Sequence, residues 1–400
     1  MKIGILTQPL HRNYGGILQN WALQQVLIHM GHKPEMIFLC GNSRPCGKLL
    51  VMRCMSFAKC VIKRYLFGCK DVYLHSILNP EYNPTLPQYA DAEFVAHIHK
   101  TKRLTADMDV AKYIASRGYD SFVVGSDQVW REDYSPYIPH YFLDFLKSDD
   151  QRLRIAYAAS FGKAKNYMSE ERMPLCRKLL HRFDAVSVRE YEGLDILSRD
   201  FDYHKGVKVL DPTLLISADD YKGLIEDKDY AHKAYVVAYI LDSSKDKTAI
   251  LAEVSSHLNL PIQSLLEEPH GAKMLTVSQW LAAFDRADFV VTDSFHGCVF
   301  SIIFHKPFIA IANEFRGLDR FISLLRDAGL ENRLVFSSEE FEMRKDSLFT
   351  VPDYTDVEHR LSAFRSVSMD FLADALRMND NEYSPNICYS SGVQCGKMAA

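Results

Sequence analysis

Short apolar runs alternate with longer stretches of helical periodicity along almost the whole chain. Apolar runs that end in polar or glycine-containing turns are typical of strands buried on both faces. They predict strands at Lys2–Thr7, Pro34–Leu39, Ser121–Gly125, Ile155–Ala159, Ala185–Val188, Ala234–Leu241, Phe289–Thr292 and Pro307–Ala312. The intervening stretches predict helices at Ile17–Met30, Met108–Arg117, Ser169–Arg182, Lys247–His257, Ser278–Ala283, Gly297–His305 and Glu358–Arg377. This alternation indicates an α/β fold built on parallel sheets.

An irregular segment interrupts the alternation near the middle of the chain. Residues 199–217 contain the turn signal Asp211-Pro212 and lack a clear period. A chain of 400 residues also exceeds the usual size of one domain. We therefore expect a first domain over residues 1–204, a second over 205–380, and a frayed Ser/Gly-rich tail over 381–400.

Composition and charge narrow the class of protein. Lys and Arg number 47 against 51 Asp and Glu, a net charge of −4, which argues against a general nucleic-acid binder. The first apolar run, Ile3 to Leu6, is too short for a signal peptide, and no run reaches the length of a membrane span. The nine cysteines include no CxxC pair. These features predict a cytoplasmic protein with reduced thiols and no zinc site.

Two strand ends carry candidate ligand-binding residues at the start of a helix. Asn13, Gly15 and Gly16 follow the first predicted strand, and glycines there let a ligand approach the free N–H groups of a helix start. A tight turn into the helix explains the same residues equally well. The run Asp293-Ser294-Phe295-His296-Gly297 follows Phe289–Thr292, at the sheet edge where α/β proteins bind ligands. His296 and Ser294 would favour a phosphate or carboxylate there.

Two further strand ends carry residues suited to anions and sugars. Arg189 follows Ala185–Val188, and its guanidinium can bind a carboxylate or phosphate in a bidentate way. An ion pair with Glu190 is the structural alternative. Asp127 and Gln128 follow Ser121–Gly125 and could hydrogen-bond to sugar hydroxyls. Trp130 could stack on a sugar face or could simply fill the core.

A basic segment stands out against the balanced charge of the chain. Residues 48–70 carry six basic residues and no acid. At helical spacing, an apolar stripe that includes Val51, Met55 and Ile62 separates from most of the basic residues. Such a segment suits an anionic membrane surface. A core-facing helix with a solvated rim is the alternative, and both remain open.

Together these strings resemble the polysaccharide pyruvyl transferase family. The resemblance runs from residue 3 to about 313 through NYGGILQNWALQ, DSFVVGSDQVW, AVSVRE, VLDPTLL and VVTDSFHGCVFSIIFHKPF. It implies two Rossmann-like domains arranged as in GT-B glycosyltransferases, with the active site in the cleft between an acceptor-side and a donor-side domain. It also implies transfer of the pyruvate unit of phosphoenolpyruvate onto two hydroxyls of a sugar or lipid-linked oligosaccharide, with no metal, cofactor or nucleotide donor.

The resemblance assigns roles to particular residues. The donor-binding arginine of the family falls on Arg189 and its donor-site histidine on His296, with Ser294 and Gly297 completing the donor end. Many members have Arg-Leu-His where this chain has Ser294-Phe295-His296, so one donor cation is missing. From the chemistry we expect His296 to act as the acid and Asp293 to orient the loop. From their positions we expect a cleft or acceptor role for Asn13, Gly15, Gly16, Asp127, Gln128 and Trp130.

Two other functions remain open at this point. One is a GT-B glycosyltransferase that uses a nucleotide sugar, although no clear base- and ribose-binding site is visible in the second half. The other is a sugar-binding protein without catalysis, because a fold does not fix a function.

Overall fold

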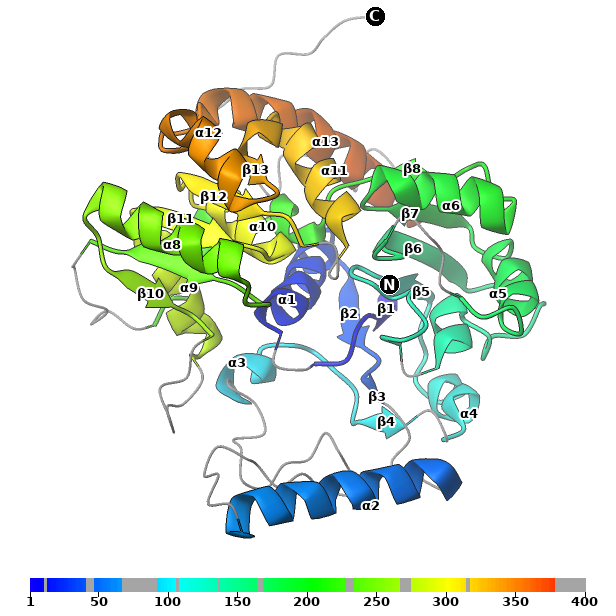
Figure 1. The fold of residues 1–400 in the computed structure, drawn as a ribbon. Coiled ribbons are helices and arrows are strands. Elements are labelled where there is room, and N and C mark those ends of the chain that lie inside the picture. Colours follow the sequence, from blue (N-terminus) through cyan, green and yellow to red (C-terminus); the bar gives the residue numbers. More distant parts are fainter. Residues whose placement is uncertain are drawn as a thin grey trace, which may run out of the picture.

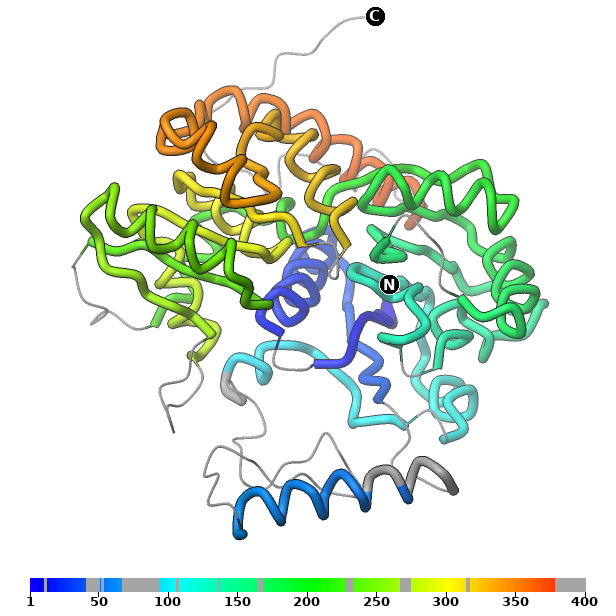
Figure 2. Tube along the Cα trace, in the orientation of Figure 1, coloured from blue at the N-terminus to red at the C-terminus, as the bar shows by residue number. Residues whose placement is uncertain are grey.

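The computed structural model describes most of the chain, and Figure 2 traces its course. The described residues are 1–10, 13–40, 47–66, 92–105, 108–135, 137–163, 168–226, 234–266, 275–313 and 317–377. The predicted tail over 381–400 lies outside them. No helix in the described ranges is long and apolar enough to cross a membrane.

The first half of the chain forms a sheet of six parallel strands in the order β2-β1-β5-β6-β7-β8 (Figure 1). The strands are β1 (Lys2–Leu6), β2 (Lys33–Met36), β5 (Ser121–Val124), β6 (Leu153–Ala159), β7 (Ala185–Val188) and β8 (Val207–Lys208). β1 pairs with β2 on one side and with β5 on the other. The strand order therefore reverses between β1 and β5, and such a switch point favours ligand binding at the carboxyl edge of the sheet.

Helices cover both faces of this sheet, which explains why its strands are continuous apolar runs. Val123 of β5 belongs to the same buried cluster as the side chains of α1 (Tyr14–His29). Its neighbours Phe122 and Val124 belong to a second cluster with α5 (Met173–Leu180) and α6 (Tyr191–Phe201). Alternate residues of the strand thus pack on opposite layers.

The second half forms a sheet of five parallel strands in the order β10-β9-β11-β12-β13. They are β9 (Val236–Tyr239), β10 (Ile262–Ser264), β11 (Phe289–Thr292), β12 (Phe308–Ile311) and β13 (Leu334–Val335). One face packs on α8 (Lys245–Leu258) and α12 (Ser338–Leu348), and the other on α9 (Val277–Arg286), α10 (Phe295–Ile303) and α11 (Leu318–Ala328). The order reverses between β9 and β11, so this sheet has its own switch point beside β11.

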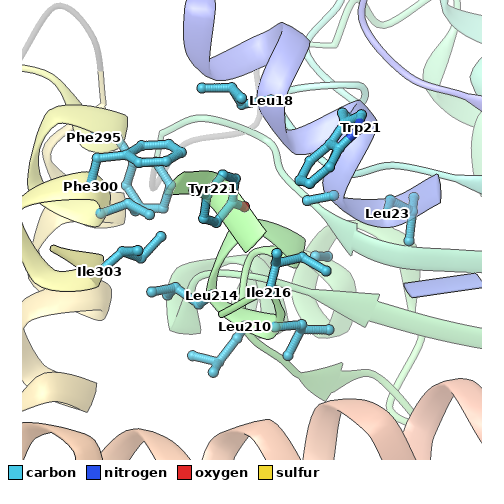
Figure 3. Close-up of a cluster of buried hydrophobic side chains, with 14 of the residues drawn as sticks. Leu18, Trp21, Leu23, Leu210, Leu214, Ile216, Tyr221, Phe295, Phe300 and Ile303 are labelled. Atoms are coloured by element: carbon cyan, nitrogen blue, oxygen red, sulfur yellow. The ribbon is translucent and has the colours of Figure 1, made fainter. Parts of the chain in front are cut away.

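A continuous apolar core joins the two halves (Figure 3). Trp21 of α1 contacts Tyr221 with 5.6 Å between ring centroids, and Tyr221 contacts Phe300 of α10 at 5.0 Å. Tyr221 belongs to the connection between the sheets, which contains η3 (Pro212–Leu215) and α7 (Ala218–Lys222). The connection between the sheets therefore packs between α1 and α10 and brings the two helices close together.

The helix α13 (Tyr354–Ala375) follows the second sheet but packs back onto the first half. Ser368 of α13 accepts a hydrogen bond from the backbone N–H of Leu210 at 2.9 Å, and Phe371 lies near Tyr157 of β6. The helix α13 therefore contacts both the connection between the halves and the first sheet.

A long excursion leaves the first sheet after β2. It contains β3 (Leu39–Cys40), α2 (Gly47–Val61), the π-helix η1 (Ile62–Leu66), α3 (Ala92–Ala96) and β4 (Leu104–Thr105), after which α4 (Val110–Ala115) leads into β5. The strands β3 and β4 pair in parallel and hold its two ends together. Figure 1 shows α2 set apart from both large sheets.

The eight predicted strands all occur in the two large sheets, with ends shifted by a few residues. The pattern missed β8, β10 and β13, which have only two or three residues and show no period. β8 extends the first sheet past the predicted division at residue 204.

Candidate active site

Residues from both sheets meet where the carboxyl edges of their strands face each other. In the first sheet, Thr7 after β1 donates its hydroxyl hydrogen to the carbonyl of Ser126 after β5, at 2.9 Å. This bond links the two loops at the switch point. His296, in the first turn of α10 after β11, lies 4.0 Å from the Asp211 carboxylate, which follows β8. The site is thus built from both halves of the chain.

The guanidinium of Arg189 lies among three carboxyl groups. It donates to Asp211 Oδ2 at 2.7 Å and to Asp127 Oδ1 at 2.9 Å, and its Nε lies 3.7 Å from Glu190 Oε2. Its side chain is 1% exposed. Burial disfavours the charged forms of these groups, but the attraction between opposite charges is the larger effect. The pKa of Arg189 is therefore raised, and the pKa values of Asp127 and Asp211 are lowered. Burial raises the pKa of Glu190, which favours its protonated form.

Asp211 is held by more than the arginine. Its Oδ1 accepts from the backbone N–H and the hydroxyl of Thr213, at 3.1 and 2.7 Å, and its Oδ2 accepts from the Ser126 hydroxyl at 3.1 Å. The sequence indicated only a turn at Asp211-Pro212, and Asp211 does cap η3. The structure adds that its second oxygen points into the charged cluster.

His296 is buried, and no group of the described residues hydrogen-bonds to its Nε2. Its ring lies against the first turn of α1, where a Cβ added to Gly15 would come within 2.0 Å of Nδ1. Only glycine leaves room for the imidazole there. Burial lowers the pKa of His296 to about 4, although Asp211 and Asp127 pull it upward. Without a ligand the imidazole is therefore neutral at pH 7.

Arg320 brings a second guanidinium to this cluster. It lies in the first turn of α11, is 6% exposed, and stands 5.5 Å from the ring centroid of Phe295, over which Arg189 lies at 4.7 Å. Burial and the charge of Arg189 lower the pKa of Arg320 to about 10, against the pull of Asp127 and Glu190. Arg320 thus remains charged at neutral pH.

Arg320 reaches the cluster because the two halves come into close backbone contact. A Cβ at Gly317, just before α11, would lie 1.8 Å from the carbonyl oxygen of Gly162, which follows β6. No pattern in the sequence marks Arg320, because an arginine in an amphipathic helix is ordinary. The glycine before the helix was the only local signal.

Asp293 lies at the same sheet edge as His296 but is fully engaged in a separate network. Its Oδ1 accepts from the N–H of Leu241 at 2.6 Å. Its Oδ2 accepts from Lys247 Nζ at 2.7 Å, from Asn313 at 2.9 Å and from the N–H of Asp242 at 3.2 Å. The carboxylate is 0% exposed. These contacts tie the loop after β11 to the loop after β9, which fits an orienting residue better than a proton donor.

Ser294 and Gly297 shape the start of α10. The Ser294 hydroxyl caps the helix by accepting from the N–H of Gly297 at 3.4 Å. A Cβ at Gly297 would meet the Thr292 hydroxyl at 2.1 Å, so this glycine permits close packing of α10 on β11. On the facing helix, Asn13 is the exposed N-cap of α1, and its side chain lies beside Gly16. The two helix starts therefore approach each other through Gly15 and His296.

Of the three candidate residues after β5, Asp127, Gln128 and Trp130, the structure places one in the charged cluster. Asp127 lies in the charged cluster, with φ +75°. Gln128 uses its side-chain oxygen to accept from Arg131 at 3.1 Å and its carbonyl to accept from Gln8, so both groups serve the loop itself. Trp130 is 1% exposed, stacks on Phe142 and donates to the Tyr141 carbonyl. The prediction that Trp130 lines the cleft is wrong, because no sugar can reach its ring without displacing the core.

Three known structures align with this chain over most of its length. The UDP-GlcNAc 2-epimerase of Methanocaldococcus jannaschii aligns with a TM-score of 0.51 and 12% identity, covering 88% of this chain and 93% of that one. The Neisseria meningitidis UDP-GlcNAc 2-epimerase bound to UDP-GlcNAc aligns at 0.49 with 11% identity, covering 94% and 100%. The spinosyn rhamnosyltransferase SpnG in complex with thymidine diphosphate aligns at 0.39 with 10% identity, covering 96% and 98%. The first of these alignments, with the two parallel sheets, confirms the predicted GT-B-like α/β fold.

Sequence comparison identifies the family. No curated protein matches the sequence. The sequence profile described as polysaccharide pyruvyl transferase matches residues 13–314, well over half of the chain. The match includes Asp127, Arg189, Asp211 and His296 of the charged cluster, and it ends before Arg320. The chain therefore belongs to the polysaccharide pyruvyl transferase family.

Proposed function

We propose that this protein transfers the pyruvate unit of phosphoenolpyruvate onto two hydroxyls of a sugar during polysaccharide biosynthesis. The products would be a pyruvate ketal and inorganic phosphate. Family membership supports pyruvyl transfer. One structural observation supports a compact anionic donor: two guanidinium groups, Arg189 and Arg320, lie in one buried cluster with the neutral imidazole of His296.

Arg320 is the candidate for the donor cation that Ser294-Phe295-His296 lacks. Phosphoenolpyruvate carries a carboxylate and a phosphate on a short frame, and both groups suit guanidinium and a helix N-terminus. The N–H groups of Arg189 already face Asp127 and Asp211, so a donor must compete with these carboxylates for it. We assign direct donor contact to His296, to whose Nε2 no described residue hydrogen-bonds, and to Arg320, the second cation of the cluster. Arg189 holds Asp127 and Asp211 in place and adds positive charge beneath the donor.

Charge balance couples donor binding to a proton. Before the donor arrives, the two arginines face the carboxyl groups of Asp127, Asp211 and Glu190, and His296 is neutral. A donor phosphate adds negative charge to a buried site, which is costly unless a positive charge arises nearby. The imidazole of His296 is the group that can supply it, because a phosphate close to it raises its pKa.

The protonated His296 then serves as the acid. Its proton goes to C3 of phosphoenolpyruvate, which becomes a methyl group, while C2 becomes electrophilic and a sugar hydroxyl oxygen bonds to it. The second hydroxyl oxygen replaces phosphate at C2. Of the two hydroxyl protons, one restores the histidine and the other leaves with phosphate. Asp211, 4.0 Å from Nε2, stabilises the imidazolium during this cycle.

The acceptor enters beside the start of α1 in this proposal. Asn13 is exposed there, while the neighbouring Gly15 touches His296. An amide side chain can donate to and accept from sugar hydroxyls. A sugar or a lipid-linked oligosaccharide bound over Asn13 and Gly16 would therefore present its hydroxyl pair to the buried donor.

The deciding experiment follows phosphate release from phosphoenolpyruvate with a panel of nitrophenyl and lipid-linked sugars. We expect release that requires an acceptor, together with a new ketal methyl signal in the NMR spectrum of the product. Consumption of a nucleotide sugar without phosphoenolpyruvate would instead identify a glycosyltransferase. Sugar binding with no turnover of either donor would contradict catalysis.

A further inference from the structure

The excursion after β2 carries a helical segment with no acidic residue. We call residues 47–66, which form α2 and η1, the basic arm. It lies within a longer stretch, residues 36–70, that contains no Asp or Glu at all. Because the whole chain has a net charge of −4, this concentration of one sign is a local property of the arm.

The apolar stripe of the basic arm faces solvent. Val51 is 58% exposed, Met55 57%, Ile62 43% and Leu66 78%, and Tyr65 beside the stripe is 69% exposed. Among the described residues, seventeen large apolar side chains are exposed, and these five lie within twenty residues. This exposure rules out the core-facing helix for the described side chains of the stripe, since such a helix would bury them.

Basic side chains flank the stripe. Lys59 and Lys63, four residues apart on one side, are exposed, and Arg64 lies partly exposed next to Tyr65. A lysine beside an apolar stripe can lay its methylene chain along the apolar surface while the ammonium reaches an anionic head group. An interfacial tyrosine adds an apolar ring with a polar tip at the same depth. The arm therefore has both parts of an interfacial helix.

The basic arm also has a defined place in the fold. The excursion that contains the arm leaves the first sheet after β2. It does so at the carboxyl edge of the sheet, where Asp127 and Arg189 also lie. Figure 1 shows α2 standing away from the large sheets on the side of β3, β4 and α3. A flat surface can approach it there without meeting either sheet.

We propose that the basic arm docks the protein on an anionic lipid bilayer. Charge complementarity selects this occupant: a surface of anionic head groups over hydrocarbon matches a basic rim beside an apolar stripe. Two copies of the chain could pair through their apolar stripes, but this would bring two basic arms together, and their like charges oppose it. Docking would hold the site close to lipid-linked acceptors, but the docking itself does not depend on the donor or the reaction.

The test is cosedimentation of the full chain with phosphatidylcholine vesicles that contain or lack phosphatidylglycerol. We expect binding to the anionic vesicles only, weakened by salt. Each basic residue near an anionic surface contributes about fivefold in affinity. The affinity of the triple variant Lys59→Glu, Lys63→Glu, Arg64→Glu for anionic vesicles should therefore fall at least about 100-fold. A matched variant at exposed lysines elsewhere, Lys33→Glu, Lys178→Glu, Lys205→Glu, should keep most of the binding.

The apolar stripe needs its own variant. Met55→Ser with Leu66→Ser should weaken the binding that survives high salt, whereas Met343→Ser with Val351→Ser, which alters equally exposed residues outside the arm, should not. Equal sedimentation with neutral and anionic vesicles would overturn the proposal, as would equal losses in the arm and control variants. Self-association that Met55→Ser with Leu66→Ser abolishes, without vesicle binding, would assign the arm to a second copy of the chain and also overturn it.

Discussion

Two charged clusters lie at the carboxyl edges of the sheets, and they differ in how completely their polar atoms are paired. The Asp293 cluster joins Lys247, Asn313 and two backbone N–H groups around one carboxylate. The Arg189 cluster joins the carboxyl groups of Asp127, Asp211 and Glu190 with a second arginine, yet no described residue hydrogen-bonds to Nε2 of His296. A buried polar atom without a partner is costly. This contrast supports our proposal that the first cluster holds the loop in place and the second binds the donor.

The largest expected effect comes from replacing the imidazole. His296→Gln keeps a polar side chain of similar reach but cannot carry the proton, so turnover should fall ~10²–10⁴-fold while phosphoenolpyruvate still binds. Steady-state phosphate release together with a direct binding assay measures both quantities. The matched control is His305→Gln, which alters an exposed histidine just after the end of the same helix and should leave turnover unchanged. Normal turnover in His296→Gln would move the acid role to a carboxyl group.

The Asp293 cluster should respond in stability rather than in chemistry. Lys247→Met removes the ammonium from a fully buried carboxylate, and losing one partner of such a pair costs about 3 kcal/mol. Urea denaturation measures this loss, and the folded fraction should turn over at the normal rate. Lys245→Met, at an exposed position two residues earlier in α8, is the control. A variant of normal stability and low activity would place Lys247 in the reaction.

The pH dependence of stability sharpens the comparison further. The pKa of His296 is about 4 in the folded protein and about 6.5 when unfolded, so the unfolded state binds the extra proton between these values. The stability that the neutral imidazole contributes is fully present above pH 6.5 and is lost as the pH falls toward 4. The free energy of unfolding falls by roughly 3 kcal/mol over this range. Denaturation of wild type and His296→Gln across this range should show the difference. Parallel pH profiles would contradict a buried neutral imidazole.

The smallest predicted change concerns the second guanidinium. Arg320→Lys keeps the charge but loses the planar fork, so KM for the donor should rise about tenfold, or roughly 1.4 kcal/mol, with a smaller change in kcat. Arg326→Lys, which alters an exposed arginine on the same helix, is the control. An unchanged KM in Arg320→Lys would leave donor binding to Arg189 and His296 alone.

Local patterns predicted the sheets and part of the site. The strands that carry Asp127 and Arg189 are apolar runs with polar ends, and parallel pairing alone brings such ends to one edge of the first sheet. His296 follows a similar apolar run, but in the second sheet, so strand pairing does not bring it to the other two. Trp130 shows the limit of this argument, because a core tryptophan and a sugar-stacking one have the same local sequence. Its surroundings, Phe142 and Phe161, come from later segments of the chain.

Long-range contacts account for what the sequence missed. Arg320 joins the cluster through the approach of Gly317 to Gly162, two glycines separated by much of the chain. Asp211 lies in a turn, as predicted, but its second oxygen meets Arg189 only because β8 adds to the first sheet. Neither contact leaves a period or a spacing in the sequence.

The central claim is that His296 takes up a proton from solution when an anionic donor binds in the Arg189 cluster. Titration calorimetry with phosphoenolpyruvate at pH 7, in buffers of different ionisation enthalpy, counts the protons taken up on binding. We predict an uptake approaching one proton per donor for the wild type, because the free imidazole is neutral and the bound one charged. In His296→Gln the donor should bind with almost no uptake. Binding without proton uptake in the wild type, or binding of a nucleotide sugar in place of phosphoenolpyruvate, would contradict the account.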